Sequence, residues 1–492
     1  MALAKPKFEK PLMLIDGELV ESQSGERFKT HNPSNGEELA TIPDGNSQDI
    51  DLAVNAAHDA FQSWSREYTS TDRSEMLFDL ADLVRDNVDN LAAIDAADSG
   101  NPISEMRRDL NVAADTLDMY GGLAKEIKGE TIPVDEINTL NYTVEQPYGV
   151  VARIVAYNHP TRFAVAKIAA PLVTGNTVVI KPPEQDSTGV LELGRLIQEH
   201  SIFPDGVVNI VSGFGKSVGD PLVRHKKVKK VGFTGSVETG KIVEKAAADS
   251  LTGVLSELGG KNPGIIFPDT DLHNAIKKCV DGMNFTWCGQ SCGSITRVFI
   301  HEDQYDEALE LLKKEIESIE PGDPLDWETD MGCLVSQKQL EKVQKYIELG
   351  KTSGARLITG GSPPSGDKFK NGNYLRPTLF ADVEPDMRIA QEELFGPVCF
   401  VFKWSDEEKM IETANNVDYG LTGCVFTDDL HRAHRVSQEL QAGFVWINHA
   451  GPHYLGAPFG GWKESGNGRE EALSELFEFT QTKNINIKYN NI

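Results

Sequence analysis

The sequence predicts an α/β protein with more than one domain. Two stretches, at about residues 149–248 and 262–448, alternate apolar, β-branched segments with segments of helical periodicity. Such alternation is typical of parallel sheets covered by helices, which bind ligands where the carboxyl ends of the strands meet. The chain has 492 residues, too many for one hydrophobic core, so two or three domains are expected.

The region before the first stretch is mixed in character. Residues 1–50 contain turn pairs such as Asp16-Gly17 and Asn35-Gly36, which predict short strands and turns. Residues 49–128 have apolar side chains at three- and four-residue spacing and predict helices, whereas residues 139–146 predict an extended segment. The first stretch then predicts strands at 149–155, 176–180, 207–211 and 228–233, and helices at 163–172, 187–200, 218–224 and 240–248.

The second stretch predicts another α/β unit. Its expected strands are 262–267, 298–301, 357–359, 378–381, 398–402 and 443–447, with one helix ending near residue 284 and another at 304–319. The polar, Gly- and Pro-rich segment 360–373 predicts a surface loop. The tail from Leu476 alternates apolar and polar residues and predicts a strand that could pair with another subunit.

The charge and hydropathy exclude some classes of protein. The formal net charge is −27, from 75 acidic and 48 basic residues, and so negative a surface argues against nucleic-acid binding. It favours solubility and is also typical of proteins from salty habitats. No run of eighteen apolar residues predicts a membrane span, and the first ten residues lack the apolar core of a secretion signal.

The six cysteines, at positions 279, 288, 292, 333, 399 and 424, form no CxxC pair and no zinc-spaced cluster with histidine. We therefore expect no metal site and no disulfide scaffold. Scattered reduced thiols are typical of a cytoplasmic enzyme, in which most cysteines are inert core residues.

Two segments are candidate phosphate and ribose contacts. Gly235 and Ser236 follow a predicted strand and precede a helix, where backbone N–H groups and the helix dipole suit a pyrophosphate. The segment matches neither GxGxxG nor a Walker loop, so a plain capped turn is an equally good interpretation. Lys181 and Glu184 end another strand and can bind ribose hydroxyls, although for these two residues taken alone a solvated loop is the better interpretation.

Three further segments carry candidate catalytic groups. Cys292 has small neighbours that leave its thiol accessible, and a thiol becomes a nucleophile as its thiolate. Glu257 precedes two glycines, and Asn158 follows a predicted strand, where its amide can donate to an oxyanion. Each segment taken alone could be an ordinary turn or a core position.

Together these segments resemble the aldehyde dehydrogenase superfamily along nearly the whole chain. The matching segments, in order, are IVAYNHP, GNTVVIKPPE, FPDGVVNIVSG, VGFTGSVETG, ELGGKNP, GQSCGSITR, EELFGPV, NNVDYGL and PFGGWKESGNGRE. The resemblance implies a Rossmann-like cofactor domain, a second α/β catalytic domain and a small β oligomerisation element. These correspond to residues 1–125 with 148–258, residues 259–460, and residues 126–147 with 475–492.

The resemblance also implies a role for each matching residue. Cys292 matches the nucleophile, Glu257 the base that activates water, and Asn158 the oxyanion-hole amide. Cofactor contacts are implied at Lys181, Glu184, Gly235, Ser236, Glu393, Phe395 and Tyr157. Glu464 matches a carboxylate that serves as a candidate proton relay.

The implied reaction is oxidation of an aldehyde to a carboxylic acid through a thiohemiacetal and a thioester on Cys292. Because Glu257 is present, the resemblance favours hydrolysis of the thioester over its transfer to coenzyme A. A carboxylate at Glu184 accepts from a ribose 2′-hydroxyl and repels a 2′-phosphate, which favours NAD over NADP. The family also implies a homodimer or a homotetramer.

The chain departs from the family around the implied substrate tunnel. Tyr157 and His159 flank Asn158, where the family usually has Trp or Phe before the Asn and Phe after it, and Thr161 and Arg162 replace apolar residues. The other tunnel positions implied by the resemblance are Ser291, His449, His453 and Tyr454. So polar a set predicts a polar, anionic or aromatic substrate. Arg162 could anchor a carboxylate or, equally, pair with a protein acid.

Three alternative functions remain open at this point. A non-catalytic relative would typically lack the nucleophile or the base, both of which are present here. A glutamyl phosphate reductase-like activity would act reductively on an acyl phosphate, which Glu257 and the segment PFGGWKESG disfavour. An NADP-dependent semialdehyde or glyceraldehyde-phosphate dehydrogenase would need an anion site, for which Arg162 is the candidate.

Overall fold

The structure is a computed structural model that describes residues 3–489. Its larger sheet has eight strands in the order β2-β1-β9-β8-β7-β10-β11-β21. The five central strands run parallel, while β1, β2 and β21 are antiparallel to their neighbours. The strands are β1 (Met13–Ile15), β2 (Glu18–Val20), β7 (Val150–Ile154), β8 (Thr177–Lys181), β9 (Val208–Ile210), β10 (Val228–Thr234), β11 (Gly253–Glu257) and β21 (Gly466–Asn467).

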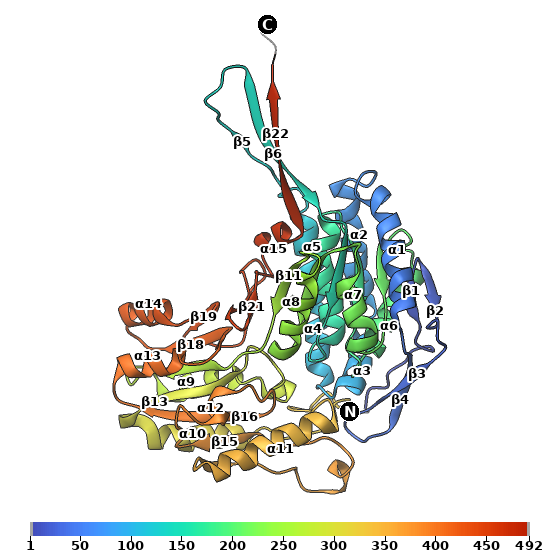
Figure 1. Ribbon diagram of the computed structural model, residues 1–492. Helices are drawn as coiled ribbons and strands as arrows, with labels where there is room; N and C mark the ends of the chain where they lie inside the picture. Colours follow the sequence, from blue (N-terminus) through green and yellow to red (C-terminus); the bar gives the residue numbers. More distant parts are fainter. Residues whose placement is uncertain (1–2, 490–492) are drawn as a thin grey trace.

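Helices cover both faces of this first sheet (Figure 1). Side chains alternate along β7, so that Val151 belongs to one core and Val150 and Ala152 to the other. The first core is completed by α2 (Ser70–Asp86), α3 (Val88–Ser99), α4 (Ile103–Gly122), α5 (Pro160–Val173) and α6 (Thr188–Glu199). The second core contains α1 (Ser47–Trp64), α7 (Asp220–Arg224) and α8 (Val237–Ala248). Burial on both faces explains why these strands are mostly apolar.

The second sheet has seven strands in the order β14-β15-β16-β13-β12-β18-β19, parallel except for β14. These are β12 (Asn262–Ile266), β13 (Ile295–His301), β14 (Arg356–Thr359), β15 (Thr378–Ala381), β16 (Val398–Trp404), β18 (Thr422–Phe426) and β19 (Phe444–Ile447). Its helices are α9 (Leu272–Asp281), α10 (Tyr305–Glu317), α11 (Gln337–Thr352), α12 (Arg388–Gln391), α13 (Glu407–Asn415) and α14 (Leu430–Glu439). One large apolar core joins these elements.

The predicted α/β class and the two alternating stretches are confirmed. The structure adds strands β11 and β18 and helices α11, α13 and α14, which the pattern did not predict. Both added strands contain glycine, and the three helices have mostly polar sequences with few apolar residues to reveal a pattern. The expected surface loop at 360–373 contains a short 3₁₀ turn whose Phe369 is buried against Tyr374.

A three-stranded arm projects from the first sheet (Figure 1). It consists of β5 (Thr131–Ile132), β6 (Thr139–Pro147) and β22 (Thr480–Lys488), with β22 paired to β6 over nine residues. The predicted C-terminal strand is therefore confirmed. One edge of this strand, β22, pairs with β6 of the same chain. Short α15 (Leu473–Glu478) connects β21 to this arm. Within residues 3–489, no helix has the length and apolarity needed to cross a membrane.

Candidate active site

The first sheet gathers several predicted residues at one edge. Strands β7, β10 and β11 are adjacent and parallel, so their carboxyl ends meet there. Asn158 follows β7, Ser236 follows β10, and Glu257 is the last residue of β11. This is the edge at which open parallel sheets bind ligands.

The Cys292 segment is a tight loop between a 3₁₀ turn, Phe285–Trp287, and β13. Cys288 and Gly289 have positive φ angles of 54° and 64°, which turn the chain sharply. Gly260 must be a glycine because a Cβ there would lie 2.4 Å from the carbonyl oxygen of Cys292. The loop is therefore held against the segment that follows Glu257.

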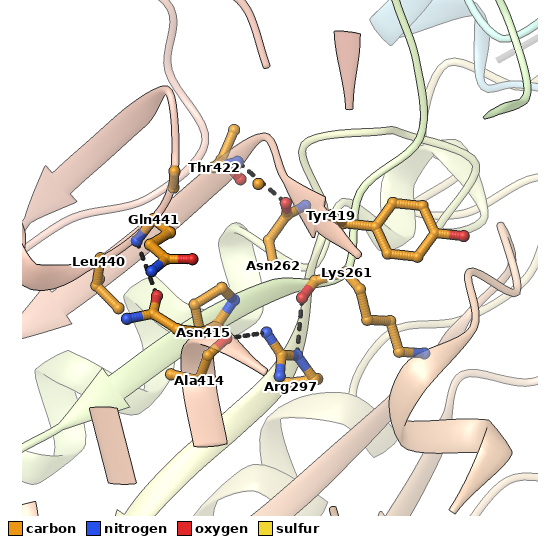
Figure 2. Close-up of a pocket in the computed structure, with 12 residues that line it drawn as sticks. Lys261, Asn262, Arg297, Ala414, Asn415, Tyr419, Thr422, Leu440 and Gln441 are labelled. Carbon is orange, nitrogen blue, oxygen red and sulfur yellow. Dashed lines mark hydrogen bonds between the residues drawn. The ribbon is translucent and has the colours of Figure 1, made fainter. Parts of the chain in front are cut away.

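Asn262 at the start of β12 fixes the backbone of this loop. Its amide nitrogen donates to the carbonyl oxygens of Cys292, at 2.7 Å, and Ser294, at 2.8 Å. Its amide oxygen accepts from the backbone N–H of Thr422 at 3.0 Å, a bond visible in Figure 2. A rigid backbone on both sides gives the Cys292 thiol a defined direction.

The pocket drawn in Figure 2 is lined by other residues of this region and not by Cys292, Glu257 or Asn158. Arg297 lies in it and donates to the carbonyl oxygens of Lys261, Thr413 and Ala414. Because its donors are used by backbone acceptors, we interpret this pocket as a structural feature behind the nucleophile loop.

Cys292 differs from the other cysteines in its exposure. It is partly exposed, whereas the remaining five are buried and unpaired. Burial of the thiol, followed by the nearby carboxyls of Glu257 and Glu393, raises the pKa of Cys292 to about 12, against a smaller opposing effect of Lys167. The thiol is thus protonated at neutral pH in the absence of a ligand, and a positive charge beside it would activate it.

Glu257 is a buried carboxyl with unused hydrogen-bonding capacity. It is 4% exposed, and neither of its oxygens bonds to any described residue. Burial, followed by repulsion from Glu470, raises the pKa of Glu257 well above its usual range. A carboxyl in this state can take up a proton near neutral pH, as a general base must.

Asn158 lies in the loop before α5 and is 3% exposed. Its backbone carbonyl accepts a hydrogen bond from the Asn101 amide at 3.1 Å, which fixes the loop. A buried side-chain amide at this sheet edge can donate to a developing negative charge.

The structure reveals a buried carboxylate that the motifs did not point to. Glu470 is 6% exposed and pairs with Lys167 of α5, and its charge acts on Glu257. Glu464, the predicted relay, instead lies at the surface, where its carboxylate pairs with Lys241 at 2.7 Å. The relay role of Glu464 therefore stays a prediction, and the buried Glu470, whose charge acts on Glu257, is a second candidate for it. Glu470 is the last residue of the matching segment PFGGWKESGNGRE. The sequence therefore contained a signal for this second carboxylate.

The predicted cofactor residues form two groups. In the first, the buried ammonium of Lys181 contacts Glu184 at 3.0 Å, and Ser236 caps α8 by accepting from the Thr239 N–H at 3.3 Å. Gly235 precedes that cap, and a Cβ there would lie 2.6 Å from the Phe233 ring. An ammonium, a carboxylate and a helix N-terminus together suit ribose hydroxyls and a pyrophosphate.

The second group lies nearer to Cys292. Glu393 accepts a hydrogen bond from the Gly260 N–H at 2.9 Å, and a Cβ at Gly259 would lie 2.2 Å from its carboxylate. Phe395 has a φ of 57° and meets the ring of Tyr157 edge to face at 5.7 Å. A carboxylate and two aromatic rings can hold a second ribose and its base, so the residues present fit a dinucleotide.

The predicted tunnel residues join a network of alternating charge. Asp109 of α4 contacts the Nδ1 of His159 and pairs with Arg162 at 3.1 Å. Arg162 also lies 3.9 Å from Glu471, which in turn bonds the Nδ1 of His453 at 2.9 Å. Arg162 thus pairs with a protein acid, which was one of its two predicted roles. The motifs did not point to either carboxylate of this network.

The remaining tunnel residues lie outside this network. Ser291 accepts a hydrogen bond from the amide of Asn284 at 3.3 Å. Tyr454 is 55% exposed and packs against His449, with ring centroids 6.1 Å apart. Thr161 is buried and donates to Asp95 at 2.7 Å, so it has a structural partner. Within residues 3–489, no group of His, Cys, Asp or Glu is arranged to hold a metal ion.

Comparisons with known proteins find similarity along nearly the whole chain. A family model described as "Aldehyde dehydrogenase family" matches residues 19–485. The chain is 42% identical to the aldehyde dehydrogenase tropH of Talaromyces stipitatus, over 99% of this chain and 96% of that protein. It is also 42% identical to human retinaldehyde dehydrogenase 3, over 98% and 93% of the two chains. The NAD+ complex of an aldehyde dehydrogenase from Bacillus cereus superposes with a TM-score of 0.94 at 39% identity, covering 98% and 97% of the chains.

Proposed function

The chain belongs to the aldehyde dehydrogenase family, and from this premise we propose that it oxidises an aldehyde with NAD through a thiohemiacetal and a thioester on Cys292. Its relatives are named as aldehyde dehydrogenases, so the chain is an oxidoreductase. The observation that carries the finer proposal is the partly exposed Cys292 thiol beside Glu257, a buried carboxyl bonded to no described residue.

In the first half-reaction the Cys292 sulfur, as its thiolate, adds to the aldehyde carbon. The resulting oxyanion needs donors, which the Asn158 amide and the backbone N–H of Cys292 would provide. Loss of one such donor typically lowers the rate about 100- to 1000-fold. When bound, NAD supplies the acceptor for the hydride that leaves this carbon, and the acyl group remains on Cys292 as a thioester.

In the second half-reaction Glu257 takes a proton from a water molecule as that water attacks the thioester. The carbon–sulfur bond breaks, the carboxylic acid leaves, and Cys292 regains its thiolate. Glu257 must then release its proton. The ion pair of Glu470 and Lys167 next to it is the proposed relay.

The proposed cofactor is NAD. Lys181 and Glu184 would hold the adenosine ribose, Ser236 the pyrophosphate, and Glu393 the nicotinamide ribose, with Phe395 and Tyr157 beside the ring. The NAD+ complex of the Bacillus cereus relative supports this assignment.

The proposed substrate is a neutral aldehyde with an aromatic ring and a hydroxyl group. The guanidinium of Arg162 is already paired with Asp109 and lies near Glu471. A substrate carboxylate would therefore meet two protein carboxylates and an arginine that already pairs with one of them, which disfavours a semialdehyde or a phosphorylated aldehyde.

The two histidines of the network favour such a substrate. Both use Nδ1 for a carboxylate, which leaves Nε2 for a substrate hydroxyl. The His159 ring lies 5.5 Å from Trp287, and the His453 ring stacks on Phe459 at 4.3 Å. Aromatic rings in this arrangement suit an aromatic aldehyde.

The cysteines support a location in the cytoplasm. All six are free, and five are buried without a disulfide. Reduced thiols are typical of proteins in a reducing compartment.

The test of the reaction is pre-steady-state NADH formation with a panel of aldehydes. We expect Cys292→Ala to give no NADH. We expect Glu257→Gln to give a burst of one NADH per site followed by turnover slowed about 100-fold or more, because only hydrolysis needs the base. Glu470→Gln should also slow turnover, whereas the matched surface variant Glu464→Gln should behave as the parent.

A parent enzyme without NADH formation would indicate a non-catalytic relative, and a requirement for coenzyme A or phosphate would contradict hydrolysis.

The test of the substrate class compares kcat/KM for 4-hydroxybenzaldehyde, benzaldehyde, succinate semialdehyde and glyceraldehyde 3-phosphate. We expect the hydroxylated aromatic aldehyde to be best and both anions to be poor. His453→Phe should reduce the ratio of kcat/KM for 4-hydroxybenzaldehyde to that for benzaldehyde about tenfold. A loss of this size is typical when one hydrogen bond to a polar group is removed. The exposed His431→Phe is the control. Succinate semialdehyde as the best substrate would overturn the proposal and restore Arg162 as an anchor.

A further inference from the structure

A second ion pair lies behind the proposed relay. The guanidinium of Arg153, on β7, donates to Glu470 at 3.0 Å and lies 3.9 Å from Glu475 of α15. Glu470 contacts Lys167 through its other carboxylate oxygen. One carboxylate is therefore held between two cations, each of them no more than 9% exposed.

The fold makes room for Arg153 inside the first sheet. This side chain is 1% exposed, and a Cβ on the neighbouring Gly232 of β10 would lie 2.0 Å from its guanidinium. Its guanidinium also lies over the ring of Phe479, 5.2 Å from the centroid. Two of its nitrogens, Nε and Nη1, bond to no described residue. The cation is thus oriented toward the two carboxyls by the shape of its site.

Glu475 is fixed just as closely. It is 3% exposed, accepts from the Tyr120 hydroxyl, and accepts from the backbone N–H of Glu471 at 2.9 Å. The donor of this hydrogen bond, Glu471, is the residue that follows Glu470 in the chain. Glu475 therefore sets both the charge beside Arg153 and the path of the chain that carries Glu470.

The buried charges do not balance when every group is ionised. Arg153 and Lys167 are the two cations, while Glu257, Glu470 and Glu475 are three carboxyls. Burial, followed by repulsion from Glu470, raises the pKa of Glu475 to about 7, whereas Lys167 and Arg153 outweigh burial and lower the pKa of Glu470. Burial thus favours the neutral forms of Glu257 and Glu475, whereas the two cations favour the ionised form of Glu470.

We propose that Arg153 and Glu475 are positioning residues for thioester hydrolysis, which hold the Glu470 carboxylate on Lys167 and set the net charge felt by Glu257. This inference rests on the proposed roles of Cys292 and Glu257. Neither residue touches the reacting atoms. Both act by fixing the position of Glu470 and by the charge that each adds to the buried cluster.

The proposal predicts opposite effects for the two residues. The pKa of Glu257 depends on the charges of Glu470, Lys167, Glu471 and Arg469. The pKa of Glu475 depends on the charges of Glu470, Arg153 and Lys167 and on the hydrogen bond from Tyr120. Replacing Glu475 by glutamine removes a negative charge, so Glu257 ionises at lower pH. Replacing Arg153 by glutamine removes a positive charge, so Glu257 ionises at higher pH.

The experiment follows decay of the acetyl-enzyme directly. The full chain is acetylated on Cys292 with p-nitrophenyl acetate, the excess ester is removed, and the acetyl-enzyme is measured by mass spectrometry between about pH 5.5 and 9. We expect the midpoint of the pH–rate profile to move by about half a unit, down in Glu475→Gln and up in Arg153→Gln. Arg153→Lys retains the charge and should restore most of the parental profile.

Glu478→Gln is the matched control, because Glu478 is on the same helix but pairs with Lys230 outside the cluster. Its midpoint should equal that of the parent. Unmoved midpoints in both Glu475→Gln and Arg153→Gln, or shifts in the same direction, would overturn the inference. Should Arg153→Gln fail to fold, as shown by thermal unfolding, the nearly isosteric Glu475→Gln decides alone. A parent that is never acetylated, or Glu257→Gln that hydrolyses normally, would instead refute the proposed function.

Discussion

At the scale of single residues, the site is arranged so that its nucleophile is inactive at rest. Burial, followed by the carboxyls of Glu257 and Glu393, raises the pKa of the Cys292 thiol, and burial also raises the pKa of Glu257. Both groups respond in the same direction to a positive charge placed between them, since such a charge lowers both pKa values. A thiol that reacts only when its ligand site is filled is protected from unproductive alkylation and oxidation.

Glu184 carries the prediction on cofactor choice. Its carboxylate is partly exposed and lies 3.0 Å from the Lys181 ammonium, at the edge where the adenosine ribose is expected. A 2′-phosphate there would be repelled, so kcat/KM for NAD should exceed that for NADP. Glu184→Gln removes the repulsion and should raise the NADP-to-NAD ratio about tenfold, which corresponds to about 1.4 kcal/mol.

The control for this prediction is Glu199→Gln, at the exposed end of α6. Its ratio should remain that of the parent in steady-state assays with saturating aldehyde. A parental preference for NADP would show that the carboxylate of Glu184 does not face the ribose.

At the scale of elements, the sequence predicted most of what positions the site. Strands β7, β8 and β10 are almost wholly buried and mostly apolar, so their pattern was clear. Strand β11 was missed although it ends in Glu257, because its exposed Gly253 and its Ser256 weaken the apolar run. The role of Asn262 was also missed. Three hydrogen bonds from one side chain depend on the loop and two strands meeting, which no local pattern encodes.

The charged network shows the limit of such prediction most clearly. His159 and Arg162 were identified as unusual, but their partner Asp109 lies on another helix, in a sequence typical of a helix exposed to solvent. Whether an arginine binds a substrate or a protein carboxylate depends on tertiary contacts. The sequence therefore supplied the two interpretations, and the structure shows the pairing.

At the scale of the whole molecule, the C-terminal segment completes the site. After the second sheet, β21 returns to pair with β11 of the first sheet. This return brings Glu470 to Arg153 and Lys167, which are 317 and 303 residues away along the chain. The proposed relay thus depends on contact between the two halves of the chain, and it is continuous through α15 with the base of the arm.

The arm itself leads to a prediction about assembly. Strand β22 lies at one edge of the arm and β19 at one edge of the second sheet, and neither outer edge has a strand partner among residues 3–489. Ile487 and Tyr489 near the tip are 37% and 45% exposed. Unprotected edges with apolar side chains tend to pair with another chain. We therefore expect a homodimer or homotetramer in which the arm contacts a second copy.

Ile487→Glu places a charge on this surface and should shift the protein toward the 54.0 kDa monomer, because burying an unpaired carboxylate at an interface is unfavourable. Size-exclusion chromatography with light scattering measures the mass. Leu251→Glu is the matched control, since Leu251 is 93% exposed on a turn after α8 and does not belong to the arm. It should retain the parental mass. A monomeric parent, or an Ile487→Glu variant of unchanged mass, would show that the arm edge is not an interface, and the exposed apolar tip would then need another explanation.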